Sequence, residues 1–473
     1  GLSHSCMELP LHQLHGMKND FQLCLGIGED TMKLAKAGIV LAIGSLMSIC
    51  MVLCPGAMAS DMFTVRDGVL VEYNGTDLYV VIPEDVMAIG ERAFAECEEL
   101  FSIRIHDGVT SVGDEAFYGC MGLESVDVSG SVEKIGDFSF YGCMNLKEVK
   151  LTEGLKSIGE NAFAVCTSLE SILMPDSVGF VGDYAFYGCM ALKDVRISSG
   201  LSKIEKGMFN FCGALDNVVI PERVVEIGDY AFAGCMGLAD IVIPDGVEII
   251  GSNTFQECIS LERIEVPDSV EQIGDYSFYG CTALIDVELP TETTEMGIGV
   301  FADCSSLERV VLPRRVNTSD YMFQNCVSLR SVDFPEGMEK VGYGAFYNCG
   351  SLENISFPDG MEVIGDYAFG FCSGLVDVIV PADIDHVGNY AFGACGRLKN
   401  VIISNGVKSM GDGVFYGCSG IETVFIPESV TQMGADIFAG CHDVVICGTE
   451  GSYAKKYAEE NGISFILSGS DSI

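Results

Sequence analysis

The residues of this chain that could do chemistry are its cysteines, its few histidines and a regularly spaced set of aspartates. The 473-residue sequence contains 21 cysteines and 6 histidines. After residue 59 only His106, His386 and His442 are left, and they lie far apart in the sequence. No His-Glu-x-x-His, phosphate-binding glycine loop or Gly-x-Ser-x-Gly motif accompanies them. We therefore expect no catalytic site, no cofactor and no metal ion.

Sixteen of the cysteines close a Phe-x-x-Cys motif that recurs from Phe94 to Phe438. The motifs are 23 residues apart, except that the step from Phe301 to Phe323 is 22. Stacked strands lie about 4.8 Å apart, so a disulfide ladder or a metal rail is one interpretation. The favoured interpretation is a column of buried thiols with parallel Cβ directions, because a disulfide needs Cβ atoms that face each other.

Aspartate recurs in every second repeat at the position after a turn glycine. Its members are Asp137, Asp183, Asp229, Asp275, Asp320, Asp366 and Asp412. A row of calcium sites is one interpretation, but one carboxylate per two repeats cannot complete a calcium coordination shell. We therefore expect these side chains to be N-caps of short helical turns.

One repeat contains two kinds of apolar spacing. The spacing from Ile227 to Cys235 is helix-like, whereas Ile241 and Ile243 alternate as in a strand. Gly228 lies between them, where we expect a sharp turn with positive φ. A fixed period of this length predicts an α/β repeat solenoid. It would be a curved rod with one parallel β-sheet of short strands and short helical turns on the convex side.

The segment from Val224 to Pro244 carries the pattern V-x-x-I-G-x-x-A-F-x-x-C-x-x-L-x-x-V-x-I-P. This pattern resembles the BspA-like leucine-rich repeats over residues 84–447. Glu205 and Ser319 replace the turn glycine, and Ile421 and Val444 replace the leucine. The resemblance implies a bacterial or protozoan surface protein, often an adhesin that binds proteins of a host or partner cell.

The rest of the chain suggests export and capped ends. Residues 1–31 are unassigned, and residues 32–59 resemble a signal peptide, with an uncleaved anchor as the alternative. Residues 60–83 should form an N-terminal cap, with a hairpin and a first strand. Residues 448–473 should form a C-terminal cap helix between Ser452 and Gly462, followed by a tail. We expect a secreted or cell-surface protein with no membrane span in the mature chain.

The net charge of −42 argues against nucleic acid as a partner, because phosphate backbones would be repelled. A protein partner is expected instead, on the outward strand positions that should line the concave face. Three successive repeats place apolar Ile379, Ile402 and Phe425 at this position, and exposed apolar patches often mark interaction sites. The polar rim around them would consist of Asp377, Asn400 and Glu422.

Two alternatives remain open for this apolar run. Strand propensity alone explains such residues, and the C-terminal helix could pack on them. The sequence thus favours an exported, non-enzymatic, adhesin-like binding protein. The alternative is a structural surface-layer or spacer protein without a single specific ligand.

Overall fold

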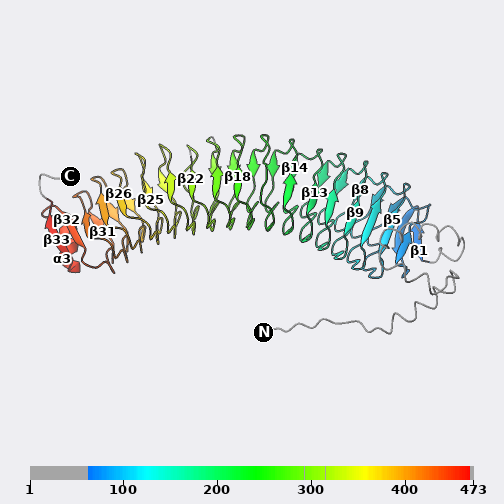
Figure 1. Ribbon diagram of the computed structural model, residues 1–473, viewed down its shortest axis with the longest axis horizontal. Helices are drawn as coiled ribbons and strands as arrows, with labels where there is room; N and C mark the ends of the chain where they lie inside the picture. Colours follow the sequence, from blue (N-terminus) through cyan, green and yellow to red (C-terminus); the bar gives the residue numbers. More distant parts are fainter. Residues whose placement is uncertain (1–61, 292, 315, 469–473) are drawn as a thin grey trace, which may run out of the picture. The chain divides into compact units, whose positions relative to one another are not determined.

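The computed structural model describes residues 62–291, 293–314 and 316–468. The expected upstream segment 1–31 and signal peptide 32–59 lie outside the described residues. Within the described part the chain winds through successive coils that stack side by side (Figure 1). Most coils contain one longer strand, a turn, one two-residue strand and a second turn, and isolated bridges at Val242, Thr318 and Asn354 replace a strand in three of them. The expected solenoid is therefore confirmed.

The longer strands pair in parallel from one coil to the next, with Val195 of one coil opposite Val218 of the following coil. An isolated bridge between Val219 and Val242 extends this column of strands. The longer strands are β3 (Tyr79–Val81), β5 (Ser102–Ile105), β7 (Ser125–Val128), β9 (Glu148–Lys150), β11 (Ser171–Leu173), β13 (Asp194–Arg196), β15 (Asn217–Val219), β18 (Arg263–Glu265), β20 (Asp286–Glu288), β22 (Arg309–Val311), β23 (Ser331–Asp333), β26 (Asp377–Val380), β28 (Asn400–Ile403), β30 (Thr423–Phe425), β32 (Val445–Gly448) and β33 (Ser464–Leu467).

A second column of strands makes the expectation of one parallel sheet wrong. Its members are too short to show an alternating pattern in the sequence, yet they pair in register, as Ile227 does with Ile250. The short strands are β4 (Ala88–Ile89), β6 (Ser111–Val112), β8 (Lys134–Ile135), β10 (Ser157–Ile158), β12 (Phe180–Val181), β14 (Lys203–Ile204), β16 (Glu226–Ile227), β17 (Ile249–Ile250), β19 (Gln272–Ile273), β21 (Glu295–Met296), β24 (Lys340–Val341), β25 (Val363–Ile364), β27 (His386–Val387), β29 (Ser409–Met410) and β31 (Gln432–Met433).

The expected helical turns are also wrong, because the segments that contain Phe-x-x-Cys are hydrogen-bonded turns. Their backbone N–H groups alternate between bonds within the turn, as Cys120 N to Phe117 O at 3.2 Å, and bonds to the next coil. Phe117 N, for example, donates to Ser139 O at 2.7 Å in the next coil. Residues with positive φ interrupt each turn twice, as Tyr230 (58°) and Gly234 (71°) do, and such a backbone cannot continue a right-handed helix.

Gly228 has a different role from the one expected, because it is not among the residues with positive φ. A Cβ atom at Gly228 would lie 2.9 Å from Ile204 O and 3.0 Å from Lys206 N of the preceding coil. The glycine therefore allows two coils to approach closely at this turn.

The core is continuous along the described stack. The phenylalanines from Phe94 to Phe438 form one stacked row, with ring centroids 4.9 Å apart between Phe94 and Phe117 and 5.7 Å apart between Phe232 and Phe255. Leucine, valine and isoleucine side chains from both columns of strands surround this row. A single coil buries little apolar surface by itself, so its stability depends on packing against the neighbouring coils.

Both ends of the described stack have distinct elements. β1 (Phe63–Arg66) and β2 (Val69–Tyr73) form an antiparallel hairpin, and β2 pairs with β4 to begin the short-strand column. At the other end, α3 (Tyr453–Asn461) begins after the N-cap Ser452 and ends at Gly462, as expected. It is the only α-helix among the described residues, and none of them forms a helix with the length and apolar character needed to cross a membrane.

Candidate partner-binding surface

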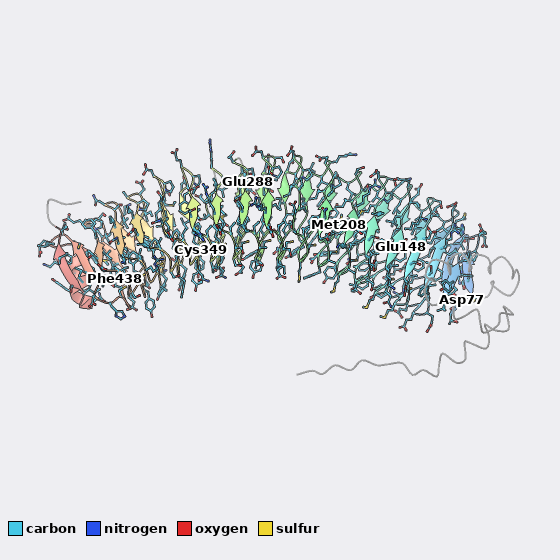
Figure 2. All side chains as sticks on the ribbon, in the orientation of Figure 1. Asp77, Glu148, Met208, Glu288, Cys349 and Phe438 are labelled. Atoms are coloured by element: carbon cyan, nitrogen blue, oxygen red, sulfur yellow. The ribbon has the colours of Figure 1, made fainter. Side chains whose placement is uncertain are left out.

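The outward side chains of the longer strands form one surface, called here the long-strand face. Alternation along each strand separates it from the core. In β26, Val378 and Val380 are buried, whereas Asp377 and Ile379 are exposed. The name refers to the longer strands that carry these side chains, and it does not depend on the direction in which the stack curves. Glu288 of β20, labelled in Figure 2, is one of its residues.

The expected apolar run is present on this face. Ile379 lies opposite Ile402, and Ile402 lies opposite Phe425 in the next coil. The row continues to Cys447 of β32 and Ile466 of β33. These five residues are called the C-terminal strip. Ile379 is 59% exposed and Ile466 is 51% exposed, whereas the side chains between them are half-buried.

Sequence reasoning missed Ile466 because β33 follows α3 and breaks the period of the repeat. The apolar alternation in Ser464–Leu467 was the signal that could have found it. Its assignment to the strip required the pairing of β32 with β33.

Two residues of the expected rim, Asp377 and Asn400, lie opposite each other in β26 and β28. Asn400 Nδ2 donates a hydrogen bond to Asp377 Oδ1 at 2.6 Å, so these two side chains are neighbours. Thr423, the residue after Glu422, lies opposite Asn400 in the paired strands, and both Glu422 and Thr423 are exposed. Glu422 precedes β30, and its carbonyl oxygen accepts a hydrogen bond from Val445 N.

The C-terminal helix packs at the end of the core and leaves the strip accessible. Its buried residues are Ala454, Tyr457 and Ala458. The ring of Tyr457 lies 6.4 Å from that of Phe438, and its hydroxyl accepts a hydrogen bond from Ile437 N. Ile466 stays half-exposed beside the helix. The alternative in which this helix covers the strip is therefore not supported.

The cysteine column is buried, as expected, but it does more than fill space. Cys235 Sγ donates to the carbonyl oxygen of Phe209 at 3.2 Å, and the same bond recurs along the column. The thiols are free, and burial raises the pKa of Cys235 to about 12. Because each Sγ points toward a Phe carbonyl and its thiolate form is disfavoured, the column has the properties of a structural row.

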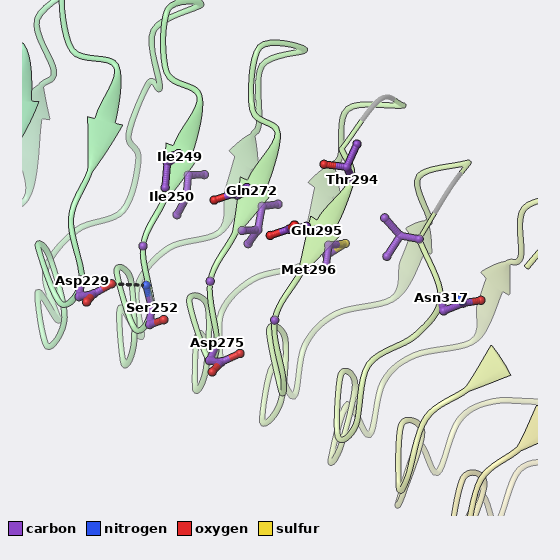
Figure 3. Close-up of a pocket in the computed structure, with 15 residues that line it drawn as sticks. Asp229, Ile249, Ile250, Ser252, Gln272, Asp275, Thr294, Glu295, Met296 and Asn317 are labelled. Atoms are coloured by element: carbon purple, nitrogen blue, oxygen red, sulfur yellow. Dashed lines mark hydrogen bonds between the residues drawn. The ribbon is translucent and has the colours of Figure 1, made fainter. Parts of the chain in front are cut away.

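The aspartate row also acts between coils, so the N-cap interpretation was wrong. Asp229 Oδ1 accepts a hydrogen bond from Ser252 N of the next coil at 2.8 Å (Figure 3). Asp275 and Asp412 accept in the same way from Ile298 and Ala435. Among the described residues no group of three acidic, histidine or cysteine side chains could hold a metal ion.

Figure 3 also shows the shallow hollow over the short strands where these carboxylates lie. It is lined by Asp229, Gln272, Asp275 and Glu295, among others. The first two described histidines are likewise part of the scaffold. His106 bonds to Pro83 O at 3.0 Å, and His386 bonds to Ser409 Oγ at 2.8 Å. Among the described residues His106 has no nucleophile as its partner. Ser409 lies within hydrogen-bond distance of His386, but its hydroxyl donates to the backbone oxygen of Asp385 at 3.2 Å, so its proton is directed to the scaffold.

Comparison with known proteins identifies a repeat family and several similar solved structures. The family described as BspA type leucine rich repeat region (6 copies) matches residues 73–193, 133–247, 225–349 and 317–445. A leucine-rich repeat protein of known structure from Bacteroides ovatus is 26% identical, with a TM-score of 0.66. The alignment covers 87% of this chain and 97% of that one. No curated protein sequence matches this chain significantly.

Two further solved structures are more distant. A leucine-rich repeat protein from Eubacterium ventriosum is 19% identical, covering 68% of this chain and 87% of that one, with a TM-score of 0.41. A leucine rich cell surface protein from Faecalibacterium prausnitzii is 22% identical, covering 89% and 99%, with a TM-score of 0.31.

The family match spans most of the chain and agrees with the coil geometry described above. Its matched ranges overlap from residue 73 to residue 445 without a gap. They include the Phe and Cys columns and both columns of strands. The chain therefore belongs to the BspA-type leucine-rich repeat family.

Proposed function

We propose that this chain is an exported, non-enzymatic binding protein of the adhesin type, which recognises a protein partner through the C-terminal strip. The strip is the observation that carries the proposal, because five apolar residues from successive coils lie side by side on an outward face. Soluble proteins rarely leave such a row open without a use for it. The sequence pattern at residues 32–59 supports export.

Most of the remaining long-strand face is polar and pairs its own charges. Arg309 lies 2.6 Å from Asp333, and Asp127 lies 3.9 Å from both Arg104 and Lys150. Exposed ion pairs of this kind contribute little to association. Val219 and Val242 form a shorter apolar pair, but it contains no aromatic residue.

The strip has the composition expected of a binding site, with aromatic Phe425 between aliphatic and cysteine side chains. Burial of apolar surface contributes about 25 cal/mol per Å², so covering Ile379, Ile402 and Phe425 would supply several kcal/mol. Aromatic residues are enriched among the side chains that dominate interface energies. Asp377 on the rim favours a partner with a basic edge, and binding should therefore weaken as salt is added.

The test compares matched serine substitutions at one register position of the face. Ile379→Ser removes a strip residue, whereas Val311→Ser removes an isolated apolar residue that is also about half exposed. The full chain is assayed on a biosensor against a panel of purified extracellular proteins. We expect Ile379→Ser and Phe425→Ala to weaken binding by about tenfold, because each truncation removes buried contact. Val311→Ser should bind normally.

Melting temperatures show whether each variant is folded. Normal binding by both strip variants would contradict the proposal, and so would an equal loss in Val311→Ser. A chain that binds none of the panel and tolerates every change on this face would instead indicate a spacer.

A further inference from the structure

A second exposed surface lies on the turns that follow the short strands, away from the long-strand face. Five tyrosines from five successive coils form a continuous row there, called here the tyrosine ladder. Its members are Tyr321, Tyr343, Tyr367, Tyr390 and Tyr416, and the centroids of successive rings are 5.1, 5.6, 5.2 and 5.9 Å apart. Tyr343 is 39% exposed and Tyr416 is 48% exposed, and the other rings are half-buried.

The backbone at three of these tyrosines is unusual for an aromatic residue. Tyr321, Tyr367 and Tyr390 have φ values of 58°, 56° and 53°. At the same place in the repeat, other coils have the residues that this conformation favours, such as Asn161 and Asn253. The core does not require a ring here, because the phenylalanine row already fills it.

The ladder is continuous only because three different repeat positions contribute to it. Tyr321, Tyr367 and Tyr390 occupy the position with positive φ, whereas Tyr343 lies one residue earlier and Tyr416 lies next to the motif phenylalanine. In coils before Tyr321 aromatic contacts are interrupted, and Tyr230, at the same position, has no ring partner among the described contacts.

The turns that carry the ladder contain only negative charges, whereas Lys340 and Lys408 lie in or beside the short strands that precede two of them. The turns at 318–326, 341–349, 364–372, 387–395, 410–418 and 433–441 contain Asp320, Asp366, Asp412 and Asp436 but no lysine or arginine. Asp320 Oδ1 and Asp412 Oδ1 accept backbone N–H bonds from the next coil at 2.8 Å, which holds these carboxylates in place. Burial, the neighbouring tyrosines and Asp366 raise the pKa of Tyr343, so its hydroxyl stays neutral.

We propose that the tyrosine ladder binds an extended segment of a basic polypeptide, rich in arginine or lysine. Tyr367 and Tyr390 stack on each other, whereas Tyr343 and Tyr416 are tilted against them and are the most exposed rings of the ladder. Exposed aromatic rings attract cations by about 0.5–2 kcal/mol each, and the fixed carboxylates add charge pairing. Tyr343 and Tyr416 lie three coils apart, so an extended chain with several cations can reach both. A neutral sugar chain can stack on the rings and donate its hydroxyls to the carboxylates, but it has no cation to pair with their charge. The ladder is independent of the C-terminal strip, which lies on the other surface.

The experiment uses the full chain and a fluorescein-labelled peptide of alternating arginine and glycine, followed by fluorescence anisotropy. A peptide with glutamine in place of arginine controls for the charge. We expect the arginine peptide to bind and the glutamine peptide not to bind. Added salt should weaken the binding, because the interaction is partly electrostatic. Binding of a neutral cello-oligosaccharide instead of the arginine peptide would overturn the proposal.

Paired variants separate the ladder from the general acidity of the chain. The double variant Tyr367→Asn and Tyr390→Asn introduces residues that this backbone already accepts at Asn161 and Asn253. We expect it to weaken peptide binding about tenfold or more, because it removes the rings against which the exposed Tyr343 and Tyr416 pack. Tyr230→Asn makes the same change outside the ladder and should leave binding unchanged.

Asp412→Asn tests the carboxylates in the same way. Asn389 Oδ1 already accepts the corresponding hydrogen bond from Asp412 N at 2.8 Å, so an asparagine can keep the contact between coils while losing its charge. Weaker binding by Asp412→Asn than by the control Asp229→Asn is expected. Tyr416→Ala serves as a second ring variant if the double variant fails to fold, since Ala439 occupies that place in the next coil. Equal affinity of ladder and control variants would refute the proposal.

Discussion

At the scale of single residues, the columns that looked chemical are hydrogen-bonding elements of the scaffold. Cys235 and Asp229 both bond to backbone groups one coil away, and Gly228 makes the close approach between coils possible. The sequence could predict that Cys235 is buried, because its neighbours are apolar. It could not predict the acceptor of the thiol, because Phe209 belongs to the preceding coil.

We expect Cys235→Ala to lower the free energy of unfolding by about 1–2 kcal/mol, through a small cavity and a lost hydrogen bond. Phe209 O keeps one donor in Cys212 N, which limits the cost. Urea unfolding measures the effect. Cys447→Ala, at a half-exposed thiol in the strip, is the matched control and should change stability by less than about 0.5 kcal/mol. Equal destabilisation by the two changes would count against a structural role for the column.

At the scale of elements, α3 protects the open end of the core. The ring of Tyr457 makes a T-shaped contact with Phe438, the last phenylalanine of the row, and its hydroxyl accepts the N–H of Ile437. Burial raises the pKa of Tyr457, as expected for a phenol inserted between coil and helix. Ser452 and Gly462 made this helix predictable, whereas its docking depended on the shape of the last coil.

Removal of this hydroxyl should loosen the last coil without unfolding the rest. Tyr457→Phe leaves the Ile437 N–H without its partner, at a cost of about 1–3 kcal/mol. Hydrogen exchange followed by mass spectrometry should show faster exchange around Ile437 and unchanged exchange in the hairpin of β1 and β2. Tyr453→Phe, at a half-exposed position of the same helix, is the control. Faster exchange along the whole stack, or none at all, would contradict a local capping role.

At the scale of the whole molecule, the buried thiols make the free energy of unfolding depend on pH in the alkaline range. A thiol of the unfolded chain ionises near pH 9, whereas burial raises the pKa of Cys189, Cys235 and Cys281 to about 12. Between these values the unfolded state binds fewer protons than the folded state, so the free energy of unfolding falls as pH rises. Stability should be insensitive to these groups below pH 9.

Melting under reducing conditions from pH 7 to pH 10.5 measures this effect, with tyrosine ionisation followed by absorbance as a control. The double variant Cys235→Ala and Cys281→Ala should show a shallower decline above pH 9 than the native chain, because fewer thiols contribute. An identical pH profile for the two proteins would show that other groups cause the decline.

The features that depend on which residues repeat could be predicted from the sequence alone. The sequence identified the coils, the buried Phe and Cys columns, the outward run at Ile379, Ile402 and Phe425, and the helix after Ser452. These features depend on which residues repeat and on local spacing, both of which are visible in one dimension.

The contacts between one coil and the next depend on tertiary packing and could not be predicted. The short strands are stable because they pair with neighbouring coils, and two residues are too few to reveal a strand by alternation. Thr423 rather than Glu422 follows Asn400 because the pairing of β28 with β30 sets the register. The strip gains Ile466, and the ladder joins tyrosines from three repeat positions, because stacking brings together residues that the period keeps in different columns.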